Sequence, residues 1–160
     1  MVNFPLIAEA STIVASIAHF GHSVTRERRI AGAIAPALIG DLNVVSLALE
    51  DVKHHALKLE QRRITQHDEI ERALRSVARI RLSAFDRFNN MLPFLGKDSA
   101  HIVIECYTTI VRTVTLIRED LESKPATHEL KEALIIMATD AEHLSKQVDK
   151  AQAHLRKYAS

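Results

Sequence analysis

Nine histidines in a chain of 160 residues make a metal site the first chemistry to consider. A helix presents two ligands to one ion when they lie three or four residues apart, because those positions share a face. Pairs with that spacing include His19 with His22, Asp51 with His54, His101 with Glu105, and Asp140 with His143. A di-iron bundle also requires Glu-x-x-His pairs on two helices, and this sequence contains none. Both Asp-x-x-His pairs flank an apolar seam, which predicts surface histidines rather than a metal site.

Nucleophilic and phosphate chemistry lack their usual motifs in this chain. The sequence contains no Gly-x-Ser-x-Gly turn, no glycine-rich phosphate loop and no His-Glu-x-x-His. The single cysteine, Cys106, rules out an internal disulfide, and its apolar neighbours predict a buried, inert thiol. We therefore expect a protein that is not an enzyme and that has no catalytic residue and no cofactor.

Three arginines, Arg72, Arg75 and Arg79, share one face of a predicted helix and could contact phosphates. Glu69 and Glu71 lie close by, which favours a solvated face whose charges pair along the helix. The formal net charge of the chain is only +1, so no overall attraction draws it to nucleic acid. The stripe remains a candidate interaction surface.

Apolar spacing predicts the elements that position these residues. In the last segment, apolar residues recur at alternating steps of four and three, the repeat of a coiled coil. They are Leu130, Leu134, Met137, Ala141, Leu144, Val148, Ala151, Leu155 and Tyr158. Similar seams run from Leu38 to Leu59 and from Val103 to Leu121. The prediction is an all-α fold, an antiparallel bundle of about four long helices with heptad-spaced seams.

The N-terminal part has a different character, so we divide the chain into an apolar helix, residues 1–24, and a bundle domain, residues 25–160. Phe4–Phe20 is apolar on nearly every helical face, and a span of about 17 residues approaches the minimum for crossing a membrane. The basic run Arg26–Arg29 follows, which fits the positive-inside pattern with a cytoplasmic bundle. Glu9 argues against the anchor. The expected location is the inner membrane, with the cytoplasm as the alternative.

A second helical segment is expected from about Ile30, after the basic run, and it begins with a small-residue face. Gly32, Pro36 and Gly40 recur every four residues, which places them on one side of a helix. Such a face lets a second backbone approach closely. Pro36 also removes a helix hydrogen bond, and we favour a kinked stretch as the interpretation, with the close approach as the alternative. We count these three residues as candidate contacts.

Aromatic residues gather in the least regular part of the chain, from Leu82 to Gly96. Phe85, Phe88 and Phe94 lie there among breaker residues, which predicts a short helical turn followed by a packed connection. The three phenylalanines are expected to close one end of the bundle and are candidate contacts, with a small hydrophobic pocket as the alternative.

Three stretches carry a resemblance: Arg29–Ile34 after the basic boundary, the aromatic-rich Ala84–Leu95, and Val103–Tyr107 on the helix that follows. They are similar to a group of small, uncharacterised bacterial proteins. The resemblance implies one N-terminal membrane helix, a basic stop and a cytoplasmic helical bundle. Glu9 departs from the cleaner first helix of that group. The resemblance implies no activity.

Together, these patterns predict a non-enzymatic interaction or scaffold protein, associated with a membrane, that acts through its helix faces. A heptad seam can close within one chain or recruit another, so a protein partner or self-association into an oligomer is expected. Two alternatives stay open. One is a soluble oligomeric bundle that binds a metal or small ligand, and the other is a regulatory protein that binds nucleic acid.

Overall fold

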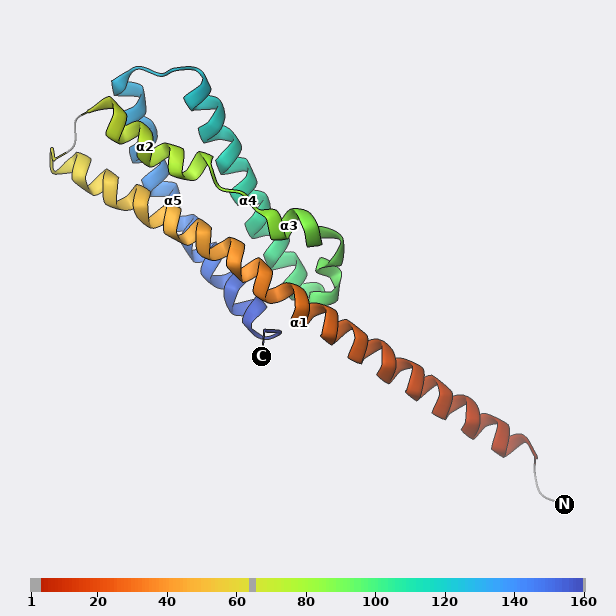
Figure 1. Cartoon of the computed structure of the whole chain (residues 1–160). Helices are drawn as coiled ribbons and strands as arrows, with labels where there is room; N and C mark the ends of the chain where they lie inside the picture. Colours follow the sequence, from red (N-terminus) through yellow and green to blue (C-terminus); the bar gives the residue numbers. More distant parts are fainter. Residues whose placement is uncertain (1–3, 64–65, 160) are drawn as a thin grey trace.

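The structure, a computed structural model, describes residues 4–63 and 66–159, with side chains for 24–63 and 66–159. Within this part every regular element is helical, and the predicted all-α bundle is confirmed (Figure 1). The elements are α1 (Phe4–Glu60), α2 (His67–Ala78), α3 (Ser83–Phe88), the 3-10 helix η1 (Asn89–Leu95), α4 (Lys97–Glu122) and α5 (Thr127–Arg156).

Three long helices, α1, α4 and α5, lie side by side along the bundle (Figure 1). α5 runs antiparallel to α1, because Gln152 Nε2 donates to Asn43 Oδ1 at 3.0 Å and Lys53 Nζ donates to Ser145 Oγ at 3.0 Å. A short connection joins α4 to α5, which makes them antiparallel neighbours. The shorter α2 packs against all three helices at the end remote from the N-terminus.

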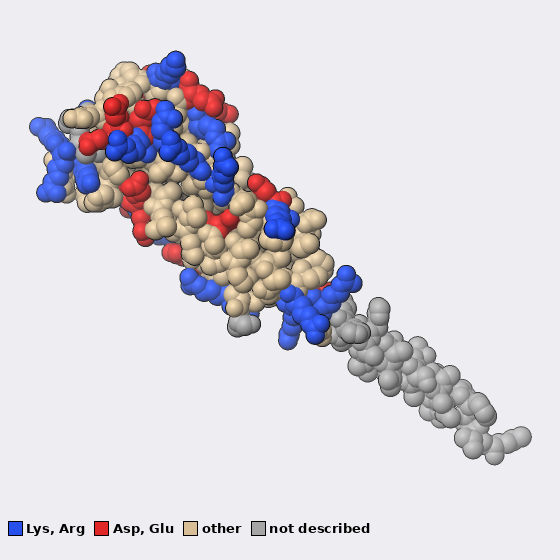
Figure 2. Space-filling model, viewed as in Figure 1, with Lys and Arg blue, Asp and Glu red and all other residues tan. Residues whose placement is uncertain are grey.

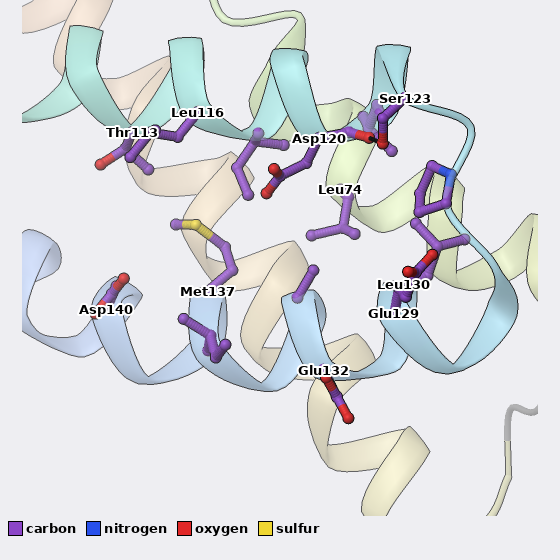
Figure 3. A pocket seen from close by; sticks show the side chains of 15 residues that line it. Leu74, Thr113, Leu116, Asp120, Ser123, Glu129, Leu130, Glu132, Met137 and Asp140 are labelled. Atoms are coloured by element: carbon purple, nitrogen blue, oxygen red, sulfur yellow. Dashed lines mark hydrogen bonds between the residues drawn. The ribbon is translucent and has the colours of Figure 1, made fainter.

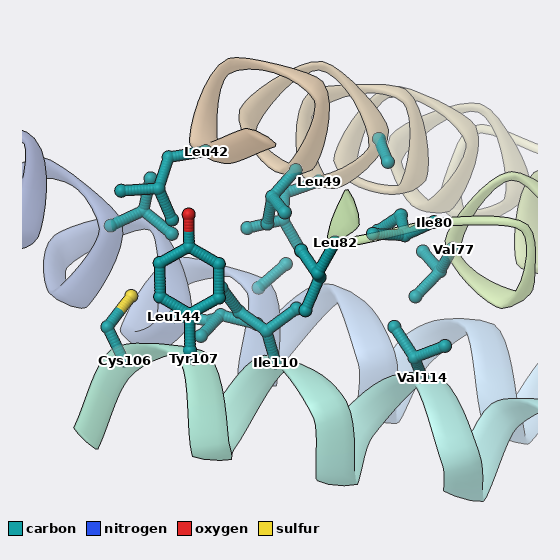
Figure 4. Packing of buried hydrophobic residues seen from close by; sticks show 14 of the residues in the cluster. Leu42, Leu49, Val77, Ile80, Leu82, Cys106, Tyr107, Ile110, Val114 and Leu144 are labelled. Carbon is teal, nitrogen blue, oxygen red and sulfur yellow. The ribbon is translucent and has the colours of Figure 1, made fainter. Parts of the chain in front are cut away.

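The predicted seams are the stripes that the helices bury. On α5 every seam residue from Leu130 to Leu155 is buried, and on α1 the same holds from Leu38 to Ala56. Figure 4 shows side chains of α1 and α4 pointing into this common core, with Tyr107 among them. Each fully buried Leu or Ile contributes about 1.5–3 kcal/mol, so the seams supply most of the packing energy of the bundle.

α1 joins two segments that the sequence separates. We expected an apolar helix over Phe4–Phe20 and a second helix from Ile30, whereas one helix of 57 residues covers both. The run Arg26–Arg29 consists of good helix formers, so nothing there stops the helix. The helix also continues through Pro36. Figure 1 shows its N-terminal part extending beyond the other helices. The side chains of Phe4–Phe20 lie outside the described residues.

The predicted irregular region forms α3 and η1, and a buried carboxylate ties it to α1. Asp41 Oδ2 accepts hydrogen bonds from the backbone N–H groups of Ala84 and Phe85, at 2.9 and 3.0 Å. Burial raises the pKa of Asp41 above its usual value, against the lowering effect of these two bonds. Gly96 ends the region at φ 75°, a conformation that favours glycine. α3 and η1 are thereby fixed between α1 and the start of α4.

Candidate interaction surfaces

The small-residue face of α1 divides into a used part and an open part. A Cβ atom at Gly32 would lie 3.2 Å from the Tyr158 carbonyl oxygen, so the glycine allows the end of the chain to pack closely. A Cβ atom at Gly40 would meet no atom within 4 Å, and Pro36 is exposed. The face therefore serves an internal contact at Gly32 and is free at Pro36 and Gly40.

The three phenylalanines have different surroundings. Phe85 stacks on Tyr107, with ring centroids 4.2 Å apart and planes at 9°. The Tyr107 hydroxyl donates to the Leu38 carbonyl at 2.9 Å, and burial raises the pKa of Tyr107 above its usual value. Phe88 is half-buried and packs against the core, whereas Phe94 is 37% exposed. Of the three, only Phe94 is exposed to a partner.

The arginine stripe lies on the outer face of α2 and at its C-terminal end. Arg72, Arg75 and Arg79 are all exposed. Arg75 contacts Glu71 Oε1 through Nη2 at 2.5 Å and through Nε at 3.1 Å. A shallow hollow of about 700 Å³ beside the stripe mixes both signs of charge; its charged lining residues are Glu71, Arg75, Arg79, Arg118, Glu122 and Lys124. Figure 2 shows the same mixture of charge over this part of the bundle.

A second cationic group lies where α1 leaves the bundle. Arg28 and Arg29 line a hollow of about 530 Å³ together with Tyr158, which follows α5. Exposed cations from both helices therefore meet at this end, and Figure 2 shows Lys and Arg gathered there. We call this group the basic collar: Arg26, Arg28, Arg29, Arg156 and Lys157. The sequence indicated only the three arginines of α1, because the contribution of α5 depends on the antiparallel packing.

A groove between α4 and α5 was not expected from the sequence (Figure 3). It has a volume of about 410 Å³, and Leu74 of α2 lies in its floor. Two apolar side chains at its edge stay exposed, Leu116 by 51% and Ile136 by 62%. Its charged lining residues are all acidic: Asp120, Glu129, Glu132 and Asp140. Periodicity along one helix cannot reveal such a groove, because it depends on which side chains of two helices face each other.

Buried polar groups join the start of α4 to the end of α5 rather than form a reactive site. Ser99 Oγ lies 3.1 Å from His154 Nδ1, and the Tyr158 hydroxyl donates to Ser99 Oγ at 3.3 Å and to the Leu95 carbonyl. Ser99 is only 6% exposed, so no substrate reaches its hydroxyl without a rearrangement. Cys106 is buried as predicted, and burial raises the pKa of its thiol to about 12.

The histidine pairs do not come together. Among the described side chains there is no group of three His, Cys, Asp or Glu residues placed to hold a metal ion. Asp51 Oδ1 lies 3.2 Å from His55 Nδ1, one turn along α1, rather than in a cluster with other ligands. The pair His19 and His22 lies outside the described side chains.

Two described segments are long and apolar enough to cross a membrane, Val24–Glu60 and Lys97–Glu122. In each, 39% of the most apolar stretch is buried inside the bundle. Their apolar seams form the core described above. The core helix of a soluble protein has the same length and apolar composition. Phe4–Phe20 lies outside the residues to which this finding applies.

Comparisons with protein-family models, with curated proteins and with solved structures find no match for this chain.

Proposed function

We propose that this protein is a non-enzymatic helical interaction protein, held at the inner membrane by Phe4–Phe20 with its bundle on the cytoplasmic side. The observation that carries the proposal is the basic collar, because its exposed cations come from α1 and from the end of α5, and Arg28 and Arg29 line the hollow where α1 leaves the bundle. Cationic residues beside an apolar segment stay on the cytoplasmic side. Each cation close to anionic headgroups adds about 1 kcal/mol of attraction.

The continuity of α1 supports the same arrangement. Arg26 follows Phe20 by six residues on one helix, which corresponds to about 9 Å at 1.5 Å per residue. The headgroup layer on each side of a bilayer is about 5–7 Å thick. A helix that ends its apolar part at Phe20 would therefore bring Arg26, the first cation of the collar, to the outer edge of the headgroups. The exposed Phe94 of η1 adds an aromatic ring to the element that packs against α1.

The first experiment separates membrane and soluble fractions of the untagged protein and washes the membranes with carbonate. We expect the protein to stay in the washed membranes. Arginines at Ile13 and Ile17 should release it, because each costs about 2.5–3.5 kcal/mol at the centre of a membrane helix. The matched control places arginines at Ile104 and Val111, two exposed positions of α4. Full solubility of the wild-type protein would contradict the anchor and support the soluble oligomeric bundle instead.

The second experiment tests orientation with reporters fused after Ser160. A fluorescent protein there should be bright and a phosphatase inactive, because the bundle is cytoplasmic. Reversing the charge of Arg26, Arg28 and Arg29 to Glu should weaken retention or orientation. The same reversal at Arg72, Arg75 and Arg79 serves as the control, since it changes the net charge by the same amount. Equal effects of the two triple variants would remove the support that the collar gives.

A further inference from the structure

We propose that the groove between α4 and α5 binds an amphipathic helix of a partner protein, one with an apolar face flanked by Lys or Arg. The groove lies on the half of the bundle that carries α2, away from the collar (Figure 1). The inference does not depend on the membrane anchor, because a soluble bundle would present the same groove.

The floor of the groove is apolar, and apolar side chains also lie at its edges. Leu130 and Met137 of α5 and Ile117 of α4 are buried beneath it, and Ala133 between them keeps the floor deep because its side chain is small. Above them Ile136 is 62% exposed, far more than the buried seam residues around it. An exposed branched side chain beside a buried apolar floor is the arrangement that a second helix can cover.

The charge of the groove selects the partner. Four carboxylates line it and no Lys, Arg or His does: Asp120, Glu129, Glu132 and Asp140. Within the described part of the chain, none of these carboxylates has a cationic nitrogen within 4.0 Å. Glu129 also accepts the N–H of Ala126 at 2.6 Å, which fixes the start of α5. A cationic helix would supply the missing charges, whereas an acidic one would be repelled.

The length of the groove suits a helix of about three turns. Glu129 and Asp140 mark its ends on α5 and are eleven residues apart, about 16 Å at 1.5 Å per residue. A partner would therefore present apolar residues at positions i, i+3 or i+4, and i+7, with its cations on both sides.

Helix α2 carries arginines on an outer face but cannot fill the groove of a second copy. α2 carries Arg72 and Arg75 outward, while its apolar residues are buried in its own bundle. These are Ile70, Ala73, Leu74 and Val77. A helix that docks must offer both its apolar face and its charges, so we infer a partner rather than a second copy.

The test titrates a fluorescent peptide of about 14 residues with the full-length protein and follows its anisotropy. The peptide carries Leu at the three anchor positions and Lys elsewhere, and its control carries Glu in place of every Lys. The protein is held in phosphatidylcholine nanodiscs, with empty nanodiscs as the blank. We expect the Lys peptide to bind at least about tenfold more tightly than the Glu peptide, with an affinity that falls as salt is added.

Two pairs of variants locate the binding. Ile136→Lys should abolish binding, whereas Val111→Lys, at an exposed position of α4 outside the groove, should leave it unchanged. The triple variant Asp120→Asn, Glu132→Gln, Asp140→Asn should weaken binding about tenfold. Its control neutralises three exposed carboxylates outside the groove: Glu105, Glu142 and Asp149.

Four results would overturn the inference. The two peptides could bind equally, or the Lys peptide could bind no more tightly to the protein than to empty nanodiscs. Ile136→Lys could also bind the Lys peptide as the wild-type protein does. Finally, light scattering could find a dimer that Ile136→Lys disrupts, which would assign the groove to a second copy of the chain.

Discussion

Replacing Asp41 with Ala should destabilise the bundle by removing the contact that fixes α3 to α1. The carboxylate is 8% exposed and accepts the N–H groups of Ala84 and Phe85 at 2.9 and 3.0 Å. These donors lie in the first turn of α3, where no intrahelical carbonyl is within reach. Without Asp41 they lose their acceptor in a part-buried position.

The size of the effect follows from two opposing contributions. Loss of a helix N-cap costs about 1 kcal/mol and up to about 2 kcal/mol, and a buried donor without an acceptor costs about 1–3 kcal/mol. Against this, the charged carboxylate of Asp41 is itself costly to bury, as its raised pKa indicates. We expect a net loss of about 2 kcal/mol for Asp41→Ala. The isosteric Asp41→Asn keeps an acceptor oxygen and should lose about 1 kcal/mol or less.

The assay is urea and thermal unfolding followed by far-ultraviolet circular dichroism. For a chain of this size, 2 kcal/mol corresponds to a fall in Tm of about 6 °C. Asp86→Asn is the control, because it removes an exposed neighbouring charge without touching the two amide bonds. The reasoning would be refuted if Asp41→Ala stayed within about 0.5 kcal/mol of the wild type, or if Asp86→Asn cost as much.

Three further outcomes are expected. First, burial raises the pKa of Asp41 above 3.8, the usual pKa of an aspartate side chain, so its ionised form weakens the fold at neutral pH. This penalty is relieved as the pH falls through the pKa of the folded state toward 3.8. The free energy of unfolding of the wild type should therefore rise relative to that of Asp41→Asn across this window, measured by urea titrations at stepped pH. Second, burial raises the pKa of Cys106 from 9.0 to about 12, so a thiol reagent at pH 8 should react roughly a thousandfold more slowly with the folded chain than with the urea-unfolded chain, followed by absorbance. Third, Gly40→Ala should stabilise α1 by about 0.5–1 kcal/mol because its Cβ enters open space, whereas Gly32→Ala should gain nothing because its Cβ lies 3.2 Å from the Tyr158 oxygen. Equal urea midpoints for the two glycine variants would contradict this.

The core could be predicted from the sequence because burial follows a single period. The seam from Leu130 to Leu155 needs only the spacing of one helix, and every member of it is buried. The same reasoning succeeded for Leu38 to Ala56. The break near Ile30 was wrong for a local reason. The basic run changes the polarity of the chain, but its residues favour a helix as much as their neighbours do.

The surfaces were harder to predict because they arise between elements. The contact of Asp41 with Ala84 links positions that are 43 residues apart, and no pattern in the sequence pairs them. The collar needs the end of α5 to return beside Arg28, which follows only from the antiparallel packing. The groove requires Ile136 to remain exposed beside a buried floor, although an apolar residue such as isoleucine is usually buried. Charge patterns along one helix therefore identified only three of the five collar residues and none of the groove.

The unbroken α1 has a geometric consequence for everything attached to it. A helix turns by about 100° and advances by about 1.5 Å for each residue. The number of residues between Phe4 and the bundle therefore sets both the rotation of the bundle about the axis of α1 and its distance from Phe4. One residue added after Arg26 would swing the groove a quarter-turn or more about the axis of α1. Seven added residues would return it to within about 20° of its original bearing, about 10 Å farther along. The number of residues in α1 thus determines the direction in which the groove faces about the helix axis.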